Sequence, residues 1–515
     1  MKKALLSVLL LLLFAPLTQP GAQLLPDGFA IEQIVKGPFT GQPVGFDILP
    51  DGRILFIELQ GNVRIAPVGA YPISGDSIHS FPDVLVETER GLLGVAGDPD
   101  WPDEPYFYFY YSGTDSASHI VRFTVTGFGV NLPTSSALTL TERYEILTIP
   151  DFDGSHNGGT LRFGPDGMLY ASNGDDENSC TAQDRSNLNG AILRLDLDDL
   201  PSSGPGGPPP IADITPDDNP FVGHPDQAAH LIWAFGLRNP FRFTVDGPTN
   251  DVYVGDVGNN NWEEANRVPY DSAGTNFGWP WFEGPDSFFT CDSLTALSPP
   301  IHVFPHMNPI PAVITGGPVY RDVIGSNLRF GPAYDGDYFF IEPNLQWIGR
   351  VKNTGGTWSV PPPVPGQPDS AKWADQIGGY ATDMQMGADG AIYMMYLSTG
   401  ALSRGIHRIV SDYTATGLDP GRPFALVLSS AQPNPAPAAG TTIQYRLPAD
   451  AAIDLAIYDV RGRLVRTLHA GRATNGSLHW DGRAEGGRPV ASGLYYYTIT
   501  APGGVRSTGK ISLVR

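Results

Sequence analysis

The chain has 515 residues, with 61 glycines, 49 prolines and a formal net charge of −22 at pH 7. This length is too great for one ordinary compact core unless the core is a closed repeat architecture. The strong negative charge argues against nucleic acid and anionic lipid as partners. A composition rich in glycine and proline, without long runs of helix formers, predicts many short strands joined by tight turns.

The N-terminal segment has the features of an export signal. Lys2 and Lys3 precede an apolar run from Ala4 to Ala15, and small residues follow it. The run is short for a membrane span and no second one follows, so we expect residues 1–22 to be a signal peptide and the mature protein to lack a transmembrane segment. The predicted location is secreted or at the cell surface.

A weak repeat follows the signal segment. Its unit is a short apolar run, an Asp-Gly turn and a run that ends in aromatic residues. Six instances, spaced about 45 to 90 residues apart, are Gly45–Ile65, Leu92–Val125, Gly159–Leu197, Arg242–Gly258, Ala333–Lys352 and Met384–Val410. Four-stranded blades arranged around an axis give this pattern. The sequence therefore predicts an all-β protein in which residues 23–411 form a six-bladed β-propeller.

One stretch inside the third unit, "GSHNGGTLRFGPDGMLYASNGDD", places a histidine before one strand and a carboxylate after the next. If Thr160–Phe163 and Met168–Ser172 pair in register around the Pro-Asp dipeptide between them, His156 lies opposite Asp175. A bulge at Gly167 would shift this register. The pattern predicts that both side chains meet at the open end of the hairpin.

Such a pair has a chemical use. A carboxylate beside an imidazole fixes its tautomer and raises its basicity, which suits a histidine that takes a proton from a substrate hydroxyl. The structural alternative is that His156 and Asp175 only close the end of a blade. Arg238 and Asn239, just before Pro240, can clamp an anionic or carbonyl-rich ligand, or can stabilise their loop through an ion pair.

Oxygen-rich turns form a further cluster. They carry Asp256, Asn259, Glu263, Glu264 and Glu283, and such turns can hold Ca²⁺ through carboxylates and backbone carbonyls. We interpret the isolated histidines His302 and His306 as structural. Cys180 and Cys291 are the only cysteines, and in an oxidising compartment they can form one disulfide, the alternative being two unrelated buried thiols.

The composition changes after Val410. Residues 412–440, which contain "SSAQPNPAPAAG", have the content of a linker. Residues 441–515 alternate apolar and polar positions, with turn residues about every 8–12 positions. This block predicts a small immunoglobulin-like β-sandwich.

Five ordered motifs between about Leu25 and Val410 carry a family resemblance: "ERGLLGVAGDPDW", "HNGGTLRFGPDGMLYASNGDD", "WAFGLRNPFRF", "VGDVGNNNWEEANRV" and "NFGWPWFEG". Together they resemble the glucose/sorbosone dehydrogenase family, the soluble aldose sugar dehydrogenases that depend on pyrroloquinoline quinone (PQQ). The resemblance implies a six-bladed propeller that oxidises a sugar. It also implies that His156 is the general base and that Asp175 orients it.

The same resemblance implies further roles by position. Arg238 and Asn239 match residues that contact the quinone, and Glu89 falls where the family has Gln or Glu near the substrate. The backbone carbonyls of Gly258 and Asn259 match the turn that binds an active-site Ca²⁺. A second, structural Ca²⁺ is implied at two positions, Glu264 and the carbonyl of Phe277.

The sequence departs from the family at the positions that hold the carboxylates of PQQ. Family members hold the PQQ carboxylates with a lysine in the fifth blade and two arginines before the sixth. Here the fifth blade reads "FFIEPNLQWIGRVK" without a lysine at that place, and Tyr380 and Thr382 stand at the arginine positions. Because PQQ is a tricarboxylate, loss of three cations weakens its binding by orders of magnitude.

The C-terminal block resembles FlgD-type immunoglobulin-like domains and the sorting domains of type IX secretion, through "IYDVRGRLVRTL", "HWDGR" and "ASGLYYYTIT". We therefore expect an exported quinoprotein-type dehydrogenase that oxidises a sugar or related hydroxyl compound with Ca²⁺. One alternative is a non-catalytic, calcium-stabilised propeller that binds glycan or protein. Another is a Ca²⁺-dependent hydrolase of the lactonase kind, with His156 activating water.

Overall fold

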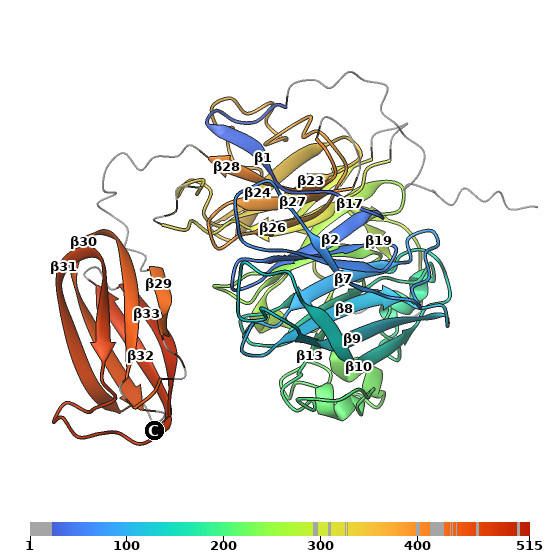
Figure 1. Ribbon diagram of the computed structural model, residues 1–515. Coiled ribbons are helices and arrows are strands. Elements are labelled where there is room, and N and C mark those ends of the chain that lie inside the picture. Colours follow the sequence, from blue (N-terminus) through green and yellow to red (C-terminus); the bar gives the residue numbers. More distant parts are fainter. Residues whose placement is uncertain are drawn as a thin grey trace, which may run out of the picture. The chain divides into compact units, whose positions relative to one another are not determined.

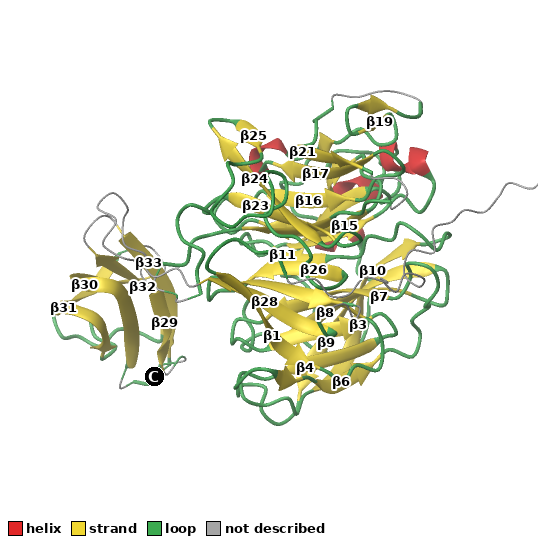
Figure 2. Ribbon diagram, turned by 90° about the horizontal axis from the view of Figure 1, so that it is seen from above, coloured by secondary structure: helices red, strands yellow, loops and turns green. Residues whose placement is uncertain are grey.

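Strands dominate the structure, which is a computed structural model of the whole chain (Figures 1 and 2). The structure describes residues 23–514 apart from 292–296, 307–310, 325, 327, 398–401, 412–426, 433, 435, 439, 460–462 and 502–504. The predicted signal peptide and most of the predicted linker lie outside the described residues. The chain divides into two compact units, of which the first contains the strands up to Ser411 and the second those from Val427 onward.

The first three large sheets of the first unit follow one another along the chain, and their consecutive strands are mainly antiparallel. The first sheet comprises β2 (Pro43–Ile48), β3 (Ile54–Glu58), β4 (Asn62–Ala66) and β6 (Asp76–Ser80). The second comprises β7 (Leu92–Gly97), β8 (Tyr106–Ser112), β9 (Ala117–Thr126) and β10 (Thr139–Pro150). The third comprises β11 (Leu161–Phe163), β12 (Leu169–Asn173), β13 (Ala191–Leu195), β14 (Ile232–Phe235) and β18 (Thr275–Asn276).

Three more sheets complete the first unit. The fourth comprises β15 (Pro240–Val245), β16 (Val252–Asp256), β17 (Trp262–Val268) and β21 (His302–Pro305). The fifth comprises β22 (Thr315–Val319), β23 (Asp337–Glu342), β24 (Trp347–Thr354) and β25 (Thr357–Ser359). The sixth comprises β26 (Ala381–Met386), β27 (Ile392–Tyr396), β28 (Gly405–Ser411), β1 (Phe29–Lys36) and β5 (Ile73–Ser74). Each of the six repeat units read from the sequence lies in a different one of these sheets.

The edge strands connect the six sheets. Strand β2 contacts β7, β7 contacts β11, and the contacts continue through β15 and β22 to β26. Strand β26 then contacts β2, so the last sheet packs against the first. The N-terminal strand β1 pairs with β28 in the sixth sheet, which joins the two ends of the unit by backbone hydrogen bonds.

Several strands are buried on both faces, which explains their composition. Strand β8 reads YFYFYYS and all of its residues are buried, and β7 and β27 are equally buried. Strands covered on both faces have near-continuous apolar sequences rather than a simple alternation. These strands therefore supply much of the apolar core of the first unit.

A charged network lies among the edge strands. The guanidinium of Arg242 is fully buried and donates to the backbone oxygens of Val44 (2.6 Å) and Thr382 (3.0 Å). Arg162 donates to the carboxylate of Asp383 at 2.9 Å. Burial lowers the pKa of Arg242 to about 10, against the attraction of Asp383, and burial also raises the pKa of Asp47. We call Arg162, Arg242, Asp47 and Asp383 the axial network.

Short elements lie in the connections between the sheets. They are η1 (Ser179–Gln183), η2 (Ile211–Ile214), η3 (Gln227–Leu231), η4 (Tyr270–Ser272) and the small hairpin of β19 (Phe282–Glu283) with β20 (Asp286–Ser287). Figure 2 shows these 3-10 turns as the few red segments. No helix in the described ranges is long and apolar enough to cross a membrane.

The second unit contains five antiparallel strands. They are β29 (Val427–Gln432), β30 (Thr441–Asp459), β31 (Leu464–Trp480), β32 (Gly493–Ala501) and β33 (Val505–Leu513). The long strand β30 pairs with β29, β31 and β32 along different parts of its length. Trp480, Leu455, Ile457 and Tyr497 belong to its own hydrophobic core, so this unit buries apolar residues independently of the first.

Candidate active site

The hairpin that carries the histidine and the carboxylate differs from its prediction. Leu161 pairs with Ala171 and Phe163 with Leu169, so the predicted register is wrong by one residue. The cause is Gly167, which adopts a left-handed conformation (φ 82°) and lengthens the turn to three residues. Direct extension of this ladder would place His156 opposite Asp176 instead of Asp175.

The histidine and Asp175 nevertheless meet, because the chain leaves the ladder before the histidine. His156 and the two glycines that follow Asn157 have positive φ values of 60°, 60° and 91°. This segment packs against the end of β12 so closely that a Cβ on Gly174 would lie 1.9 Å from the carbonyl oxygen of His156. Only glycine fits at position 174. The dyad is therefore made by loop packing and not by cross-strand pairing.

The two side chains form a direct hydrogen-bonded dyad. His156 Nδ1 lies 2.6 Å from Asp175 Oδ1. The carboxylate is fully buried, whereas the imidazole side chain keeps 12% of its surface exposed. No described residue hydrogen-bonds to His156 Nε2. An imidazole held through Nδ1, with Nε2 open, is arranged to exchange a proton with a ligand.

A second carboxylate supports the backbone of the dyad. Glu89 Oε2 accepts a hydrogen bond from the backbone N–H of His156 (2.8 Å) and from Asn239 Nδ2 (3.3 Å). Asn239 Oδ1 in turn accepts from the backbone N–H of Gly158 at 3.2 Å. The structure thus joins two predicted residues, Glu89 and Asn239, to the histidine loop.

Arg238 connects the dyad to the next sheet. Its carbonyl oxygen accepts a hydrogen bond from the Asp175 backbone N–H at 2.8 Å, and its guanidinium donates to the Val257 carbonyl at 3.0 Å. The backbone N–H groups of Arg238 and Asn239 both donate to the buried carboxylate of Asp256. Burial and the nearby Glu264 carboxylate raise the pKa of Asp256 well above its usual range.

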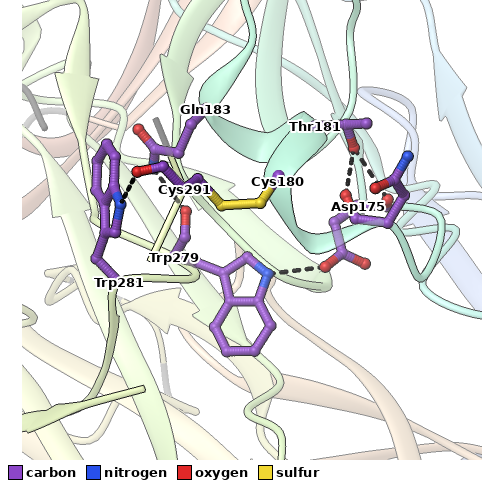
Figure 3. Close-up of a disulfide and its surroundings, with 8 residues drawn as sticks. Asp175, Cys180, Thr181, Gln183, Trp279, Trp281 and Cys291 are labelled. Atoms are coloured by element: carbon purple, nitrogen blue, oxygen red, sulfur yellow. Dashed lines mark hydrogen bonds between the residues drawn. A yellow bond between two sulfur atoms is a disulfide. The ribbon is translucent and has the colours of Figure 1, made fainter. Parts of the chain in front are cut away.

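The predicted cysteine pair joins the segment that follows Asp175 to the segment that follows Trp279. Cys180 in η1 is bonded to Cys291 in a disulfide, with Cα atoms 5.8 Å apart (Figure 3). Trp279, on the segment that leads to Cys291, donates from Nε1 to Asp175 Oδ2 at 2.7 Å (Figure 3). Asp175 therefore binds two N–H donors, one from His156 and one from Trp279, and both of its oxygens are used.

The loop that follows β16 is wound around one carboxylate. Glu283 Oε1 accepts the backbone N–H groups of Asn259, Asn260 and Asn261, each at 2.8 Å. Because the C=O and N–H of a trans peptide point in opposite directions, the carbonyls of Gly258 and Asn259 are directed away from Glu283. Two predicted calcium-binding carbonyls are thereby turned away from the loop's interior.

The residues predicted for a second calcium lie nearby. Glu264 pairs with Asp256 across β16 and β17, and its oxygens accept from Gly284 N–H and Asn266 Nδ2. Burial raises the pKa of Glu264, and the buried Asn266 Oδ1 has no hydrogen-bond partner among the described residues. Phe277 is buried and its N–H donates to Phe235. The described residues contain no cluster of three or more His, Cys, Asp or Glu suited to a metal.

Further buried acids extend from this region. Glu263 accepts from His306 Nε2 at 2.6 Å and from the Ile314 N–H at 2.9 Å, and burial raises its pKa to about 7. Burial likewise raises the pKa of Glu342 to about 7. Tyr380 is half-buried, and its loss of solvent together with the charges of Glu342, Glu89 and Glu263 raises its pKa. We call Glu263, Glu342 and Tyr380 the acid cluster.

Sequence reasoning missed the contacts that three residues make in this region. Trp279 lies in a quoted motif, but a tryptophan in an apolar run is normally a core residue, and its contact with Asp175 spans a long stretch of chain. Asp256 was considered only as a calcium ligand, although it organises the backbone of Arg238 and Asn239. His306 was interpreted as structural, and the structure places it on the buried Glu263.

Comparison with known proteins identifies the family of each unit. The family model for glucose/sorbosone dehydrogenases matches residues 40–304, and the model for FlgD immunoglobulin-like domains matches residues 436–504. The chain is 36% identical over 392 residues to the HIPL1 protein of Arabidopsis thaliana, an alignment that covers 63% of this chain and 54% of that protein. It is 29% identical over 246 residues to the aldose sugar dehydrogenase of Escherichia coli, covering 46% of this chain and 58% of the relative.

Solved structures extend the comparison to the fold. The PQQ-bound aldose sugar dehydrogenase of Streptomyces coelicolor superposes with a TM-score of 0.54 and 21% identity, covering 75% of this chain and 99% of that one. At this identity the likeness is one of fold. The chain spans about half the length of the curated relatives that it matches.

Proposed function

The chain belongs to the glucose/sorbosone dehydrogenase family, and from this membership we propose that it is an oxidoreductase that acts on a hydroxyl group of a sugar. The observation that carries the proposal is the dyad of His156 and Asp175, joined at 2.6 Å with Nε2 open. A histidine positioned in this way is suited to remove a hydroxyl proton, a contribution of about 10²–10⁴-fold to a rate.

We infer that the six sheets of the first unit are the blades of one six-bladed β-propeller. The sequential contacts of the edge strands, and the return contact of β26 with β2, support this inference. We also infer that the second unit, residues 441–515 with the preceding β29, is an immunoglobulin-like sandwich, because it matches the FlgD-type model. Loops at the ends of blade strands are the usual place for binding residues in such scaffolds.

In the proposed mechanism His156 accepts the hydroxyl proton at Nε2. Asp175 keeps the Nδ1 proton in place and stabilises the imidazolium that forms. Glu89 holds the histidine backbone through the His156 N–H, and Asn239 binds the same Glu89 oxygen. The 12% exposure of the imidazole limits the entry of water while leaving the base accessible to a ligand.

Calcium fits the residues present. The carbonyls of Gly258 and Asn259 are turned outward, and Glu264 with the unpartnered Asn266 Oδ1 offers further oxygens. We propose that Gly258 and Asn259 hold one Ca²⁺, and that Glu264 and the carbonyl of Phe277 hold another. A bound Ca²⁺ supplies Lewis-acid polarisation of an oxygen atom.

PQQ fits less well, because it carries three carboxylates. Arg238 and Asn239 lie beside the dyad, as expected for quinone contacts. The positions expected to neutralise the carboxylates are instead occupied by Tyr380 and Thr382, and the buried acids Glu263 and Glu342 lie close to Tyr380. A polyanion beside this acid cluster would lack its counter-charges. The residues present do not fit PQQ as a tightly held tricarboxylate, and we derive no step through it.

The acid cluster also favours a second candidate function. A propeller that keeps the dyad and the calcium loops but has no cations for PQQ could bind a glycan without oxidising it. This candidate predicts sugar binding without electron transfer, whereas the first predicts both.

Export is part of the proposal. The disulfide between Cys180 and Cys291 supports it, because structural disulfides persist in oxidising compartments. The FlgD-type domain is consistent with a secreted or surface-attached protein.

The test is an assay of the purified full chain with Ca²⁺ and a panel of aldoses, with and without added PQQ. Reduction of an artificial electron-accepting dye reports oxidation, and calorimetric titration reports sugar binding. Dye reduction with any aldose supports the oxidoreductase. Binding of an aldose without dye reduction under every condition supports the second candidate, and absence of both contradicts the two functions.

A further inference from the structure

Two exposed aromatic side chains lie on the segment that supports the dyad. Phe288 and Phe289 are 43% and 54% exposed, which is unusual for phenylalanine. Their backbone N–H groups donate to the carbonyls of Trp281 (2.8 Å) and Pro280 (2.9 Å). The pair is thus held in a defined backbone conformation while both side chains remain partly exposed to solvent. We call Phe288 and Phe289 the aromatic rim.

The aromatic rim is coupled to Asp175 through one indole. The rings of Phe288 and Trp279 stack with centroids 5.1 Å apart and planes 19° apart. The same indole donates its Nε1–H to Asp175 Oδ2 at 2.7 Å. Trp279 therefore has one polar edge on the dyad and one face on the rim, so the rim lies beside the site and not on a remote surface.

The disulfide links the rim to the segment that follows Asp175. Cys291 follows Phe289 closely in the chain, and Cys180 lies in η1, shortly after Asp175 (Figure 3). The Trp281 Nε1–H donates to the Cys291 carbonyl at 3.2 Å, and Gln183 Nε2 donates to the Trp279 carbonyl at 2.6 Å. These bonds restrain both ends of the rim segment, which is the preorganisation that a binding surface requires.

The chemistry of the rim matches one class of occupant. The C–H face of a pyranose ring is flat and apolar and packs on an aromatic face, while its hydroxyls remain available to polar neighbours. The surrounding acids and the chain's net charge of −22 disfavour an anionic ring. Two phenylalanines expose far less area than the roughly 1,000 Å² that a stable protein interface requires.

We propose that the aromatic rim is a carbohydrate subsite that binds a second, neutral pyranose ring beside the one presented to His156, so that the ligand is an oligosaccharide or glycan end and not a free monosaccharide. This inference rests on the proposed function, since it takes the sugar at His156 as its starting point. It adds a specificity element outside the dyad.

The experiment compares the binding of neutral trisaccharides (maltotriose, cellotriose and xylotriose) with that of glucose and xylose by calorimetry on the full chain. At least one trisaccharide is expected to bind about tenfold or more tightly than its monosaccharide. Phe288→Ala and Phe289→Ala are each expected to weaken that trisaccharide by about fivefold, with little change for the monosaccharide.

The matched control is Phe128→Ala. Phe128 is 78% exposed and follows the C-terminal end of β9. The other end of β9 is the one near the site, because the Ser118 hydroxyl there donates to Asp151, on the loop that leads to His156. This variant should leave both affinities unchanged. Circular dichroism verifies that all three variants fold.

Equal affinity for trisaccharides and monosaccharides, or rim variants that change the oligomeric state but not trisaccharide affinity, would overturn the subsite. These outcomes are separable from failure of the proposed function, because binding is measured without turnover. A protein that oxidises monosaccharides but shows no rim-dependent affinity would keep the proposed function and lose the subsite.

Discussion

The axial network and the region around His156 both bury charged groups, but they differ in balance. In the axial network two arginines stand with two aspartates, and Asp383 accepts from both Arg162 and the backbone of Phe46. Around His156 the carboxylates of Glu89, Asp175 and Asp256 are held by N–H donors and form no ion pair with an arginine or lysine among the described residues, and the acid cluster adds further carboxylates. In a charge-balanced network every charged group already has a partner. Excess carboxylates and an imidazole nitrogen without a hydrogen bond can instead bind a ligand. The first is therefore interpreted as scaffold and the second as site.

The largest expected effect comes from a substitution that disrupts the site and leaves the axial network unchanged. Asp175→Asn leaves an amide that cannot accept from both the His156 and the Trp279 N–H groups, so the histidine loses its fixed tautomer. We expect kcat on the best aldose to fall by about 10²–10⁴-fold, with an unchanged circular dichroism spectrum.

The neighbouring carboxylate provides the control. Asp176 accepts from the backbone N–H groups of Phe152 and Asp153 and does not hydrogen-bond the imidazole. Asp176→Asn should retain most of the activity. Equal losses in the two variants would mean that the loop, not the dyad, is what the substitution disturbs.

The next largest effect comes from a substitution that disrupts the axial network and leaves the residues around His156 unchanged. Asp383→Ala removes the buried partner of Arg162 and leaves Arg242 without its nearest carboxylate. We expect the free energy of unfolding to fall by about 3–5 kcal/mol, as for other buried pairs that lose one partner. Urea denaturation of the full chain measures it.

An ion pair with an exposed carboxylate provides the control for this loss of stability. Arg194 binds Asp218, whose side chain is 62% exposed, so Asp218→Ala should cost less than about 1 kcal/mol. If Asp383→Ala were equally mild, the axial network would not be a scaffold in the sense argued above.

Calcium removal tests the site separately from the scaffold, since the proposed calcium ligands Gly258, Asn259, Glu264 and Phe277 lie in the site region and not in the axial network. With free Ca²⁺ at a hundred times its dissociation constant, chelation should lower the unfolding free energy by about 2.7 kcal/mol. Glu264→Gln should abolish most of the difference between calcium and chelator, and the exposed Glu177→Gln should not. A melting temperature indifferent to Ca²⁺ in the unmodified protein would remove the calcium proposal.

A buried scaffold histidine gives the smallest expected effect. His407 on β28 is 1% exposed, its Nδ1 lacks a hydrogen-bond partner among the described residues, and burial lowers its pKa to about 4. The unfolded chain takes up a proton below about pH 6.5 and the folded chain does not until about pH 4, so stability falls as the pH falls through this window. Between pH 7 and pH 5 this share is about 2 kcal/mol.

The variant His407→Phe lacks the titrating group and should show a shallower decline over the same range. Unfolding curves recorded between pH 4.5 and 7.5 compare the two proteins. A parallel decline would show that other groups carry the acid sensitivity and that His407 is not held neutral by burial.

The sequence predicted the all-β class because turn residues and apolar runs recur in a fixed order, and each of the six units lies in its own sheet. It also paired His156 with Asp175, although for an incorrect reason. The expected register ignored the left-handed conformation of Gly167, and the two side chains meet because Gly174 admits the backbone of His156. A local pattern cannot reveal such a contact, since it depends on the absence of one methyl group at a packed position.

The role of Trp279 was inaccessible for a different reason. Trp279 lies 104 residues after Asp175 in the chain, and the two residues share no local motif. The resemblance to a family assigned roles only to residues at positions where the motifs match. At Tyr380 and Thr382, where they do not, the structure adds the acid cluster that sequence comparison alone did not suggest.

The most direct test of the central claim is the rate of sugar oxidation by the unmodified protein and by His156→Ala, measured side by side with Ca²⁺, PQQ and an electron-accepting dye. The account predicts turnover of at least one aldose by the unmodified protein and none above background for the variant, with both proteins melting at the same temperature. Turnover by His156→Ala at the unmodified rate would contradict it.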